Sequence, residues 1–171
     1  MPFHRFYCSP NLYTKEEKQA IAQAITKFYS KLPPFLVLVN FIDVDKDSFY
    51  VGGEPNDRYL RINVQHSANP VQGYVVILYC ATIRASNIDL NNHRRPWVEA
   101  YEKVIEPFTK GKGIGWELQM TNDDPTFWNA NGMHVPPFLS EDFMKWKELN
   151  RPVEWEHAVE TKAGGLNSGE T

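Results

Sequence analysis

Apolar residues recur along this chain with two different periods, and their order predicts strands and helices in alternation. Segments with a strand-like pattern cover Phe3–Cys8, Phe35–Ile42, Leu60–Gln65 and Ile114–Met120. Amphipathic segments with helical spacing lie between the first and second of these strands and between the third and fourth. The pattern therefore indicates two β-α-β units in tandem.

The first unit has clear boundaries. Thr14 and Glu17 have the spacing of a capping box, in which each side chain satisfies a free amide of the first helical turn. One apolar face follows, formed by Ile21, Ala24, Ile25 and Phe28. Pro33 and Pro34 end this helix. Residues 35–42 are apolar on both faces, which is typical of a buried parallel strand.

The second unit repeats this order after a short predicted strand, Ser48–Gly53, that ends in a glycine turn. Its helix runs from Pro96 to Phe108 and carries five apolar residues on one face: Trp97, Tyr101, Val104, Ile105 and Phe108. We therefore expect an α/β (α+β) fold. Its four principal strands should form one sheet, with both long helices on one face.

We expect residues 1–156 to form a single domain, with halves at roughly 2–55 and 58–137 and a C-terminal helix at 140–149. Phe143 and Trp146 of that helix are expected to pack on the body of the domain. Residues 157–171 are polar and contain glycine, which is typical of a disordered tail. The segment Ser67–Thr82 fits this plan badly. A genuine extra strand, an insertion and translated intron sequence in the gene model all stay open as explanations.

Composition narrows the class of protein. With 42% hydrophobic and 23% charged residues and a net charge of −3, neither nucleic acid nor an anionic membrane is an expected partner. The longest apolar run, Tyr74–Ala81, is far shorter than the ~20 residues that span a bilayer. Two cysteines in apolar stretches and five scattered histidines form no disulfide or metal motif. We expect buried, reduced thiols in a cytoplasmic protein, and a metal site has no support in the sequence.

The N-terminal sequence, MPFHRFYCSP, gives the most specific prediction of a catalytic residue. His4 and Arg5 interrupt the apolar residues too early for a signal peptide, so the fold is expected to begin at once. Removal of Met1 would turn the ring nitrogen of Pro2 into a secondary amine, which can act as a base or a nucleophile. A free α-amino group has a pKa near ~8, and burial lowers it. The alternative is that Pro2 only begins a strand and promotes removal of methionine.

Six stretches of the chain, taken in order, resemble one family. They are MPFHRFY, EEKQAIAQAITKFY, VNFIDVDKDSFYVGGEP, GIGWELQ, FWNANGMHVPPF and LNRPVEWE, and they span most of residues 1–156. Together they resemble the tautomerase superfamily, and within it the branch similar to cis-3-chloroacrylic acid dehalogenase. The resemblance implies that the amino-terminal proline is the catalyst, that no cofactor takes part and that the protein is a homotrimer.

The resemblance also implies binding residues for a small carboxylate substrate. Arg84, in Ile83-Arg84-Ala85, corresponds to the arginine that holds the carboxylate, with Arg61 as the fallback. His66 lies near the site if the insertion loops out, and is otherwise a structural histidine. Tyr29 and Asn131 are candidates for orienting the substrate, with a packing or a turn role as the alternative.

Four departures from the dehalogenase pattern restrict the chemistry. Tyr29 stands in place of a histidine, Asn87 in place of a second arginine and Leu118 in place of a tyrosine. Asn131 is the only residue near the position of the water-activating glutamate, and an asparagine cannot take a proton from water. Dehalogenation is therefore not expected.

The leading hypothesis is a cofactor-independent tautomerase, an isomerase in which Pro2 shuttles a proton on a small carbonyl or unsaturated acid and Arg84 anchors the acid. Two alternatives stay open. One is decarboxylation or hydration of a related acid, with the missing glutamate weighing against hydration. The other is a catalytically weak binding or structural member of the family.

Overall fold

The computed structural model describes residues 1–67 and 94–156. Arg84, Asn87, nearly all of the segment Ser67–Thr82 and the C-terminal tail lie outside this part of the chain. The four principal strands form one sheet in the order β2-β1-β5-β6. Their bounds are Pro2–Cys8 for β1, Leu38–Asp43 for β2, Tyr59–His66 for β5 and Gly115–Asn122 for β6.

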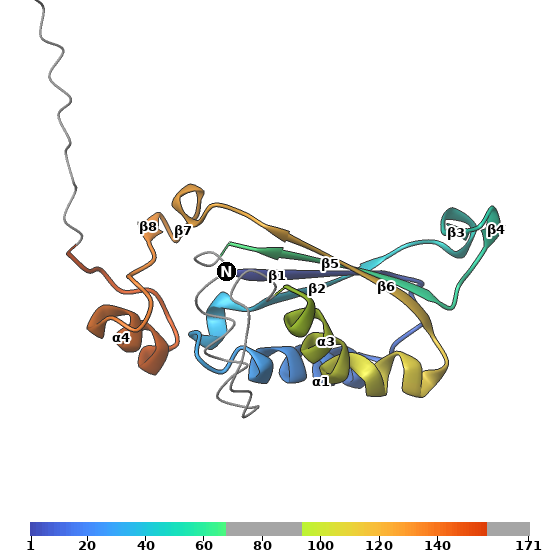
Figure 1. Cartoon of the computed structure of the whole chain (residues 1–171), viewed down its shortest axis with the longest axis horizontal. Helices are drawn as coiled ribbons and strands as arrows, with labels where there is room; N and C mark the ends of the chain where they lie inside the picture. Colours follow the sequence, from blue (N-terminus) through green and yellow to red (C-terminus); the bar gives the residue numbers. More distant parts are fainter. Residues whose placement is uncertain (68–93, 157–171) are drawn as a thin grey trace, which may run out of the picture.

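The two β-α-β units predicted from the sequence are both present. β1 pairs with β2 in parallel, β5 pairs with β6 in parallel, and the two units join through the antiparallel β1–β5 pair. The connecting helices are α1 (Lys15–Phe28) and α3 (Arg94–Ile105). Both lie on the same face of the sheet (Figure 1), as predicted. The units thus meet at the central strands β1 and β5.

The core lies between this sheet face and the two helices. Because side chains alternate along a strand, every second residue of β1 and β5 faces the helices and is buried. These residues are Pro2, His4, Phe6 and Cys8 of β1 and Leu60, Ile62, Val64 and His66 of β5. Ile21 and Ile25 of α1 and Trp97, Tyr101 and Ile105 of α3 meet them. The apolar helical faces predicted from the sequence are therefore the buried ones.

The prediction of a buried strand over residues 35–42 was wrong in part. Pro34–Leu36 form a 3-10 turn, η1, and β2 begins only at Leu38. β2 lies at the edge of the sheet, so Val39 and Phe41 pack on the core, whereas Leu38 is 42% exposed. The run is apolar on both faces, but only one of these faces meets the helices.

Short elements connect and extend the two units. The predicted strand Ser48–Gly53 is a small hairpin, β3 (Tyr50–Val51) and β4 (Glu54–Pro55), that turns at Gly52 and Gly53, both with positive φ. The 3-10 turns are η2 (Lys46–Ser48), η3 (Glu106–Phe108), η4 (Lys110–Lys112) and η5 (Pro125–Phe127). A second hairpin pairs β7 (Asn129–Ala130) with β8 (Met133–His134).

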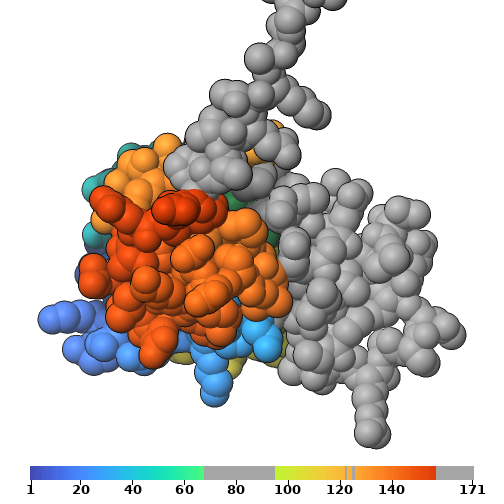
Figure 2. Space-filling view, turned by 90° about the vertical axis from the view of Figure 1, so that its left-hand side faces the viewer, coloured from blue at the N-terminus to red at the C-terminus, as the bar shows by residue number. Residues whose placement is uncertain are grey.

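The C-terminal helix α4 (Glu141–Leu149) buries Phe143 and Trp146, as predicted. It docks on the turn that precedes β2. The Phe35 amide donates a hydrogen bond of 2.9 Å to Asn150 Oδ1, and the rings of Phe35 and Trp146 lie 6.0 Å apart. Figure 1 shows this C-terminal part, in orange to red, at one end of the molecule, and Figure 2 looks onto that end. That is the end at which β1 begins (Figure 1).

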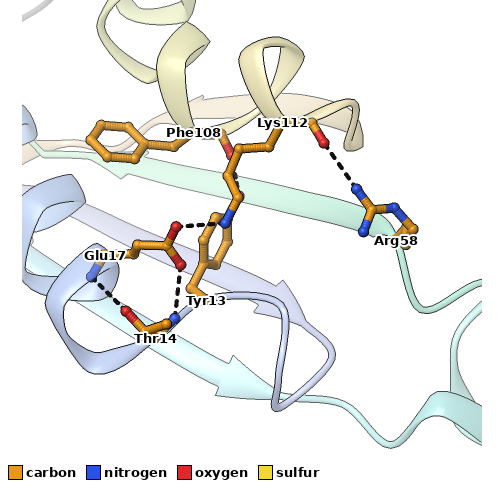
Figure 3. A network of polar contacts seen from close by, with 6 residues as sticks. All are labelled: Tyr13, Thr14, Glu17, Arg58, Phe108 and Lys112. Carbon is orange, nitrogen blue, oxygen red and sulfur yellow. Dashed lines mark hydrogen bonds and ion pairs between the residues drawn. The ribbon is translucent and has the colours of Figure 1, made fainter.

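A network of hydrogen bonds, here called the clamp, connects Tyr13, Thr14 and Glu17 to Phe108 and Lys112 at the opposite end of the helical layer (Figure 3). Thr14 and Glu17 form the predicted capping box of α1, and Lys112 Nζ donates a hydrogen bond of 2.6 Å to Glu17 Oε1. The Tyr13 hydroxyl donates to the carbonyl of Phe108 at 2.9 Å. The hydrogen bonds and ion pair lower the pKa of the Glu17 carboxyl, with the bond from Lys112 as the largest cause. The clamp therefore ties the start of α1 to the segment that follows α3.

Candidate active site at the start of the first strand

Pro2 is the first residue of the central strand β1, and its side chain is buried on the helical face. In the β1–β5 ladder it lies directly opposite His66, the last residue of β5. Met1 and Ser67 exchange both backbone hydrogen bonds, at 2.9 and 3.0 Å. The pair Pro2–His66 is therefore a non-hydrogen-bonded pair, the kind whose side chains approach each other most closely. The geometry brings the ring of Pro2 and the imidazole of His66 together.

The same alternation fixes the direction of the Pro2 nitrogen. Residues of β1 that form hydrogen-bonded pairs with β5 point their amide nitrogens toward β5, and the residues between them point theirs toward β2. Pro2 belongs to the second group. The first register pair between β1 and β2 joins Phe3 to Leu38, so the ladder begins beyond Pro2. Its nitrogen consequently lies at the end of the β1–β2 ladder.

Aromatic and imidazole rings surround this end of the core. Five of them are at most 4% exposed: His4, Tyr29, His66, Trp97 and Tyr101. The Tyr29 ring lies 6.1 Å from that of His66 and 5.5 Å from that of His4, centroid to centroid. Trp97 lies 6.4 Å from both Tyr29 and His66. The site thus draws residues from β1, β5, α3 and the end of α1.

Tyr29 reaches the site because α1 ends there. It is the C-cap residue, and its amide donates to the carbonyl of Ile25 at 3.2 Å. Its side chain then turns into the core, where the hydroxyl has no hydrogen-bond partner among the described residues. Burial raises the pKa of this phenol well above its usual value. Tyr29 is consequently a protonated donor at neutral pH.

Burial also governs the other titratable groups at this end. It lowers the pKa of the Met1 α-amino group from 8.0 to about 5. It lowers the pKa of His4 to about 3, with the neighbouring His66 as a second cause. It raises the pKa of Tyr101 well above 10.0. An amine, an imidazole and two phenols here are therefore uncharged at neutral pH, which suits a basic amine.

The remaining predicted residues do not join this cluster within the described chain. Arg84 lies outside the described residues. Asn131 is exposed at the tip of the β7–β8 hairpin, with φ +51° before Gly132, which is the geometry of a turn residue. Arg61 pairs with Glu117 at 2.5 Å on the sheet face opposite the helices. It lies opposite Tyr7, five residues from the Pro2–His66 pair, or about 17 Å along the strand.

Sequence reasoning missed His4 and Tyr101. His4 Nδ1 lies 3.0 Å from the Tyr101 hydroxyl, and both side chains are fully buried. The signal for His4 was its alternation with Pro2 in β1, which places the two side chains on one face. Tyr101 was predicted only as part of an apolar helical face, because helical spacing identifies the face of a residue and not the partner of its hydroxyl.

Residues 1–67 and 94–156 contain neither a cluster of metal ligands nor a helix that could span a membrane. There, three or more histidine, cysteine, aspartate or glutamate side chains nowhere gather as metal ligands. The helices of this same part are all too short or too polar to span a bilayer.

The family model described as "Putative oxalocrotonate tautomerase enzyme" matches residues 1–151. The chain belongs to this tautomerase family, which confirms the resemblance drawn from the sequence. No curated protein shows significant similarity to it.

Solved structures agree with this membership. Native RhCC from Rhodococcus jostii is 26% identical, with a TM-score of 0.74 over 90% of this chain and 99% of that one. A probable enzyme from the thermophilic fungus Aspergillus fumigatus is 29% identical, with a TM-score of 0.75 over 91% and 98%. N1, a member of the cis-3-chloroacrylic acid dehalogenase family, is 16% identical over 86% and 96%, with a TM-score of 0.54. This last likeness supports the fold alone.

Proposed function

We propose that this protein is a cofactor-independent tautomerase in which Pro2, freed from Met1, is the general base. The observation that carries the proposal is the position of Pro2. It begins the central strand β1, is buried opposite His66, and lies at the end of the core where burial lowers the pKa of the Met1 α-amino group and of His4. A base that is unprotonated at neutral pH can remove a proton next to a carbonyl.

The reaction needs one proton and no external reagent. The Pro2 nitrogen takes a proton from the carbon next to the carbonyl, and the C–H electron pair moves toward the carbonyl oxygen to give an enolate. The protonated amine then returns the proton, either to the enolate oxygen or to a carbon conjugated with it. The product is a tautomer or a double-bond isomer, and the amine is regenerated.

Other residues would bind the acid. Arg84 is proposed to hold the carboxylate, because a guanidinium presents paired donors to two oxygens. Tyr29 is proposed to donate to the substrate through its buried hydroxyl, and His66 to line the site opposite Pro2. Asn131 stays a weaker candidate, since its place in an exposed turn explains it without a substrate.

If Met1 is retained, the alternative function is favoured, in which the protein binds a ligand without catalysis. In the chain with Met1 in place, the α-amino group donates to the carbonyl of Ser67 at 2.9 Å. The Pro2 nitrogen is then part of a peptide bond and has no basicity. Whether the chain begins at Met1 or at Pro2 therefore separates the two functions.

A panel of 2-oxo and unsaturated carboxylic acids, each followed for isomerisation, tests the proposal. Pro2→Ala keeps an amine but makes it primary and more mobile, so kcat should fall severely while the circular dichroism spectrum stays unchanged. Pro10→Ala, at an exposed turn, is the matched control and should keep full activity. Arg84→Ala should mainly raise KM. Full activity in Pro2→Ala would end the proposal.

A further inference from the structure

The hydrogen bond between His4 and Tyr101 has no part in the function proposed above. His4 follows Pro2 on the helical face of β1, and Tyr101 reaches it from α3. Their rings stack almost in parallel, with 4° between the planes and 5.4 Å between the centroids. This geometry fixes the position of the imidazole beside Pro2.

The direction of this hydrogen bond follows from a count of donors. Burial keeps the imidazole of His4 neutral, so one ring nitrogen carries a proton and the other accepts. If the Tyr101 hydroxyl donates to Nδ1, only Nε2–H is left to satisfy. In the reverse arrangement the phenolic proton and Nε2 would both lack partners among the described residues. Since each unsatisfied buried group is costly, the first arrangement, which leaves fewer of them, is favoured.

Two buried donors then belong to neighbouring rings. Nε2 of His4 and the hydroxyl of Tyr29 both lack a hydrogen-bond partner in the described part of the chain. Both side chains are more than nine-tenths buried, and their rings are 5.5 Å apart. Two neighbouring N–H and O–H groups of this kind match one acceptor oxygen, as in the sites that stabilise an enolate or an oxyanion.

We propose that His4 Nε2–H and the Tyr29 hydroxyl form a two-donor pocket for the carbonyl oxygen of a 2-oxo acid, with Tyr101 as the residue that positions His4. The inference rests on the proposed function, because that oxygen belongs to the substrate on which Pro2 acts. Both donors are neutral, so the pocket favours a carbonyl or enolate oxygen. The substrate carboxylate would be bound elsewhere, by a positively charged side chain. A neutral imidazole is known to polarise a carbonyl in this manner.

Binding of two acids that differ in the carbonyl tests the pocket without catalysis. Pyruvate carries the oxygen, whereas propionate lacks it, and both carry the carboxylate. Titration calorimetry on the chain that begins at Pro2 should give at least about tenfold tighter binding of pyruvate, the equivalent of one good hydrogen bond. His4→Phe and Tyr29→Phe should each reduce this preference to about twofold. Equal binding of the two acids by the wild-type protein, or binding of neither, would overturn the pocket.

Tyr101→Phe tests whether Tyr101 positions His4. It also keeps the proposal testable if His4→Phe does not fold. It removes only the hydroxyl, so the preference for pyruvate should fall while affinity for propionate stays. Nitrogen-15 spectra of labelled histidine should show His4 protonated on Nε2 in the wild type and a mixture of tautomers in Tyr101→Phe. Tyr13→Phe is the control, because it removes a buried hydroxyl at the far end of the layer. A proton on Nδ1 in the wild type would refute the assignment.

These outcomes are separable from the failure of Pro2 as a base. Pro2→Ala should lose activity and keep the preference for pyruvate, because the two donors are untouched. Full activity in Pro2→Ala would refute the proposed function of Pro2. The binding preference for pyruvate would then still confirm or refute the pocket. Loss of the preference in Pro2→Ala, with the fold intact, would contradict a pocket built by His4 and Tyr29.

Discussion

Pro2 and His66 face each other across the two central strands, in a pair whose backbones do not exchange hydrogen bonds. One is the first residue of β1 and the other the last residue of β5. Because the strands are antiparallel, the start of the chain and the end of its third principal strand meet on the helical face. The pairing of β1 with β5 therefore positions the Pro2 nitrogen, which becomes an amine once Met1 is removed, close to buried rings.

The rate should depend on pH through the amine. Burial already lowers the pKa of the α-amino group at Met1 to about 5, and Pro2 is buried at the same end. A base works unprotonated, so kcat/KM should rise with pH through the pKa of the Pro2 amine and then level off. A profile of log kcat/KM between pH 4 and 9 measures this. A rate that still rises at pH 9 would contradict a lowered pKa.

Dehalogenation should be absent or marginal. Asn131 is exposed in a turn, and an asparagine cannot activate water by taking its proton. Leu118, half-buried against the core, has no hydroxyl to assist. Chloride release from both isomers of 3-chloroacrylate, followed with an ion-selective electrode, should stay near the background rate. Turnover at the rate of a proficient dehalogenase would show that another residue activates water.

The clamp at the start of α1 should contribute to stability in a pH-dependent way. Thr14→Ala removes the N-cap and should lower the free energy of unfolding in urea by about 1 kcal/mol. Lys112→Ala removes the partner that lowers the pKa of Glu17. Since the folded pKa lies below the ordinary 4.5, this stabilisation is present above pH 4.5 and is lost as the pH falls through the folded value.

Urea titrations at pH 7 and pH 3 check this clamp. Lys112→Ala should be less stable than wild type at pH 7, and the difference should shrink at pH 3. Lys110→Ala is the control, because its ion pair with Glu106 is highly exposed and should contribute little. The same difference at both pH values would mean that Lys112 stabilises the fold through packing alone.

The sequence predicted the fold well because its signals are local. The capping box at Thr14, the double proline at Pro33-Pro34 and the two apolar helical faces each depend on residues close together in the chain. The edge position of β2 was missed, since an apolar run such as 35–42 does not reveal how many of its faces are covered. Pairing order depends on contacts between strands that lie far apart in the sequence.

The candidate site was predictable only in part for a related reason. Pro2 was identified by its position after methionine, Tyr29 by resemblance, and His66 by its place just before the segment for which an insertion is one explanation. The structure brings all three to one end of the core. The bond between His4 and Tyr101 joins residues 97 positions apart, and no local pattern marks such a pair. Buried polar pairs of this kind become visible only when the two elements are packed together.

A homotrimer is expected from the resemblance, and the sheet face opposite the helices offers a surface for it. That face carries Arg5, hydrogen-bonded to Gln65 at 2.7 Å, and the ion pair of Arg61 with Glu117. Leu38 adds an exposed apolar side chain at the edge strand. Light scattering at micromolar concentration should give three times the chain mass of 19.8 kDa. A mass of one chain would contradict this expectation.

The most direct test of the catalytic proline compares chains that differ only in the state of its nitrogen. Preparations made with different amounts of methionine aminopeptidase would be assayed on one active acid, and intact mass would give the fraction of chains that begin at Pro2. The account predicts specific activity proportional to that fraction and close to zero when every chain keeps Met1. Activity that does not depend on the fraction would contradict it and leave Pro2 as the first residue of a strand.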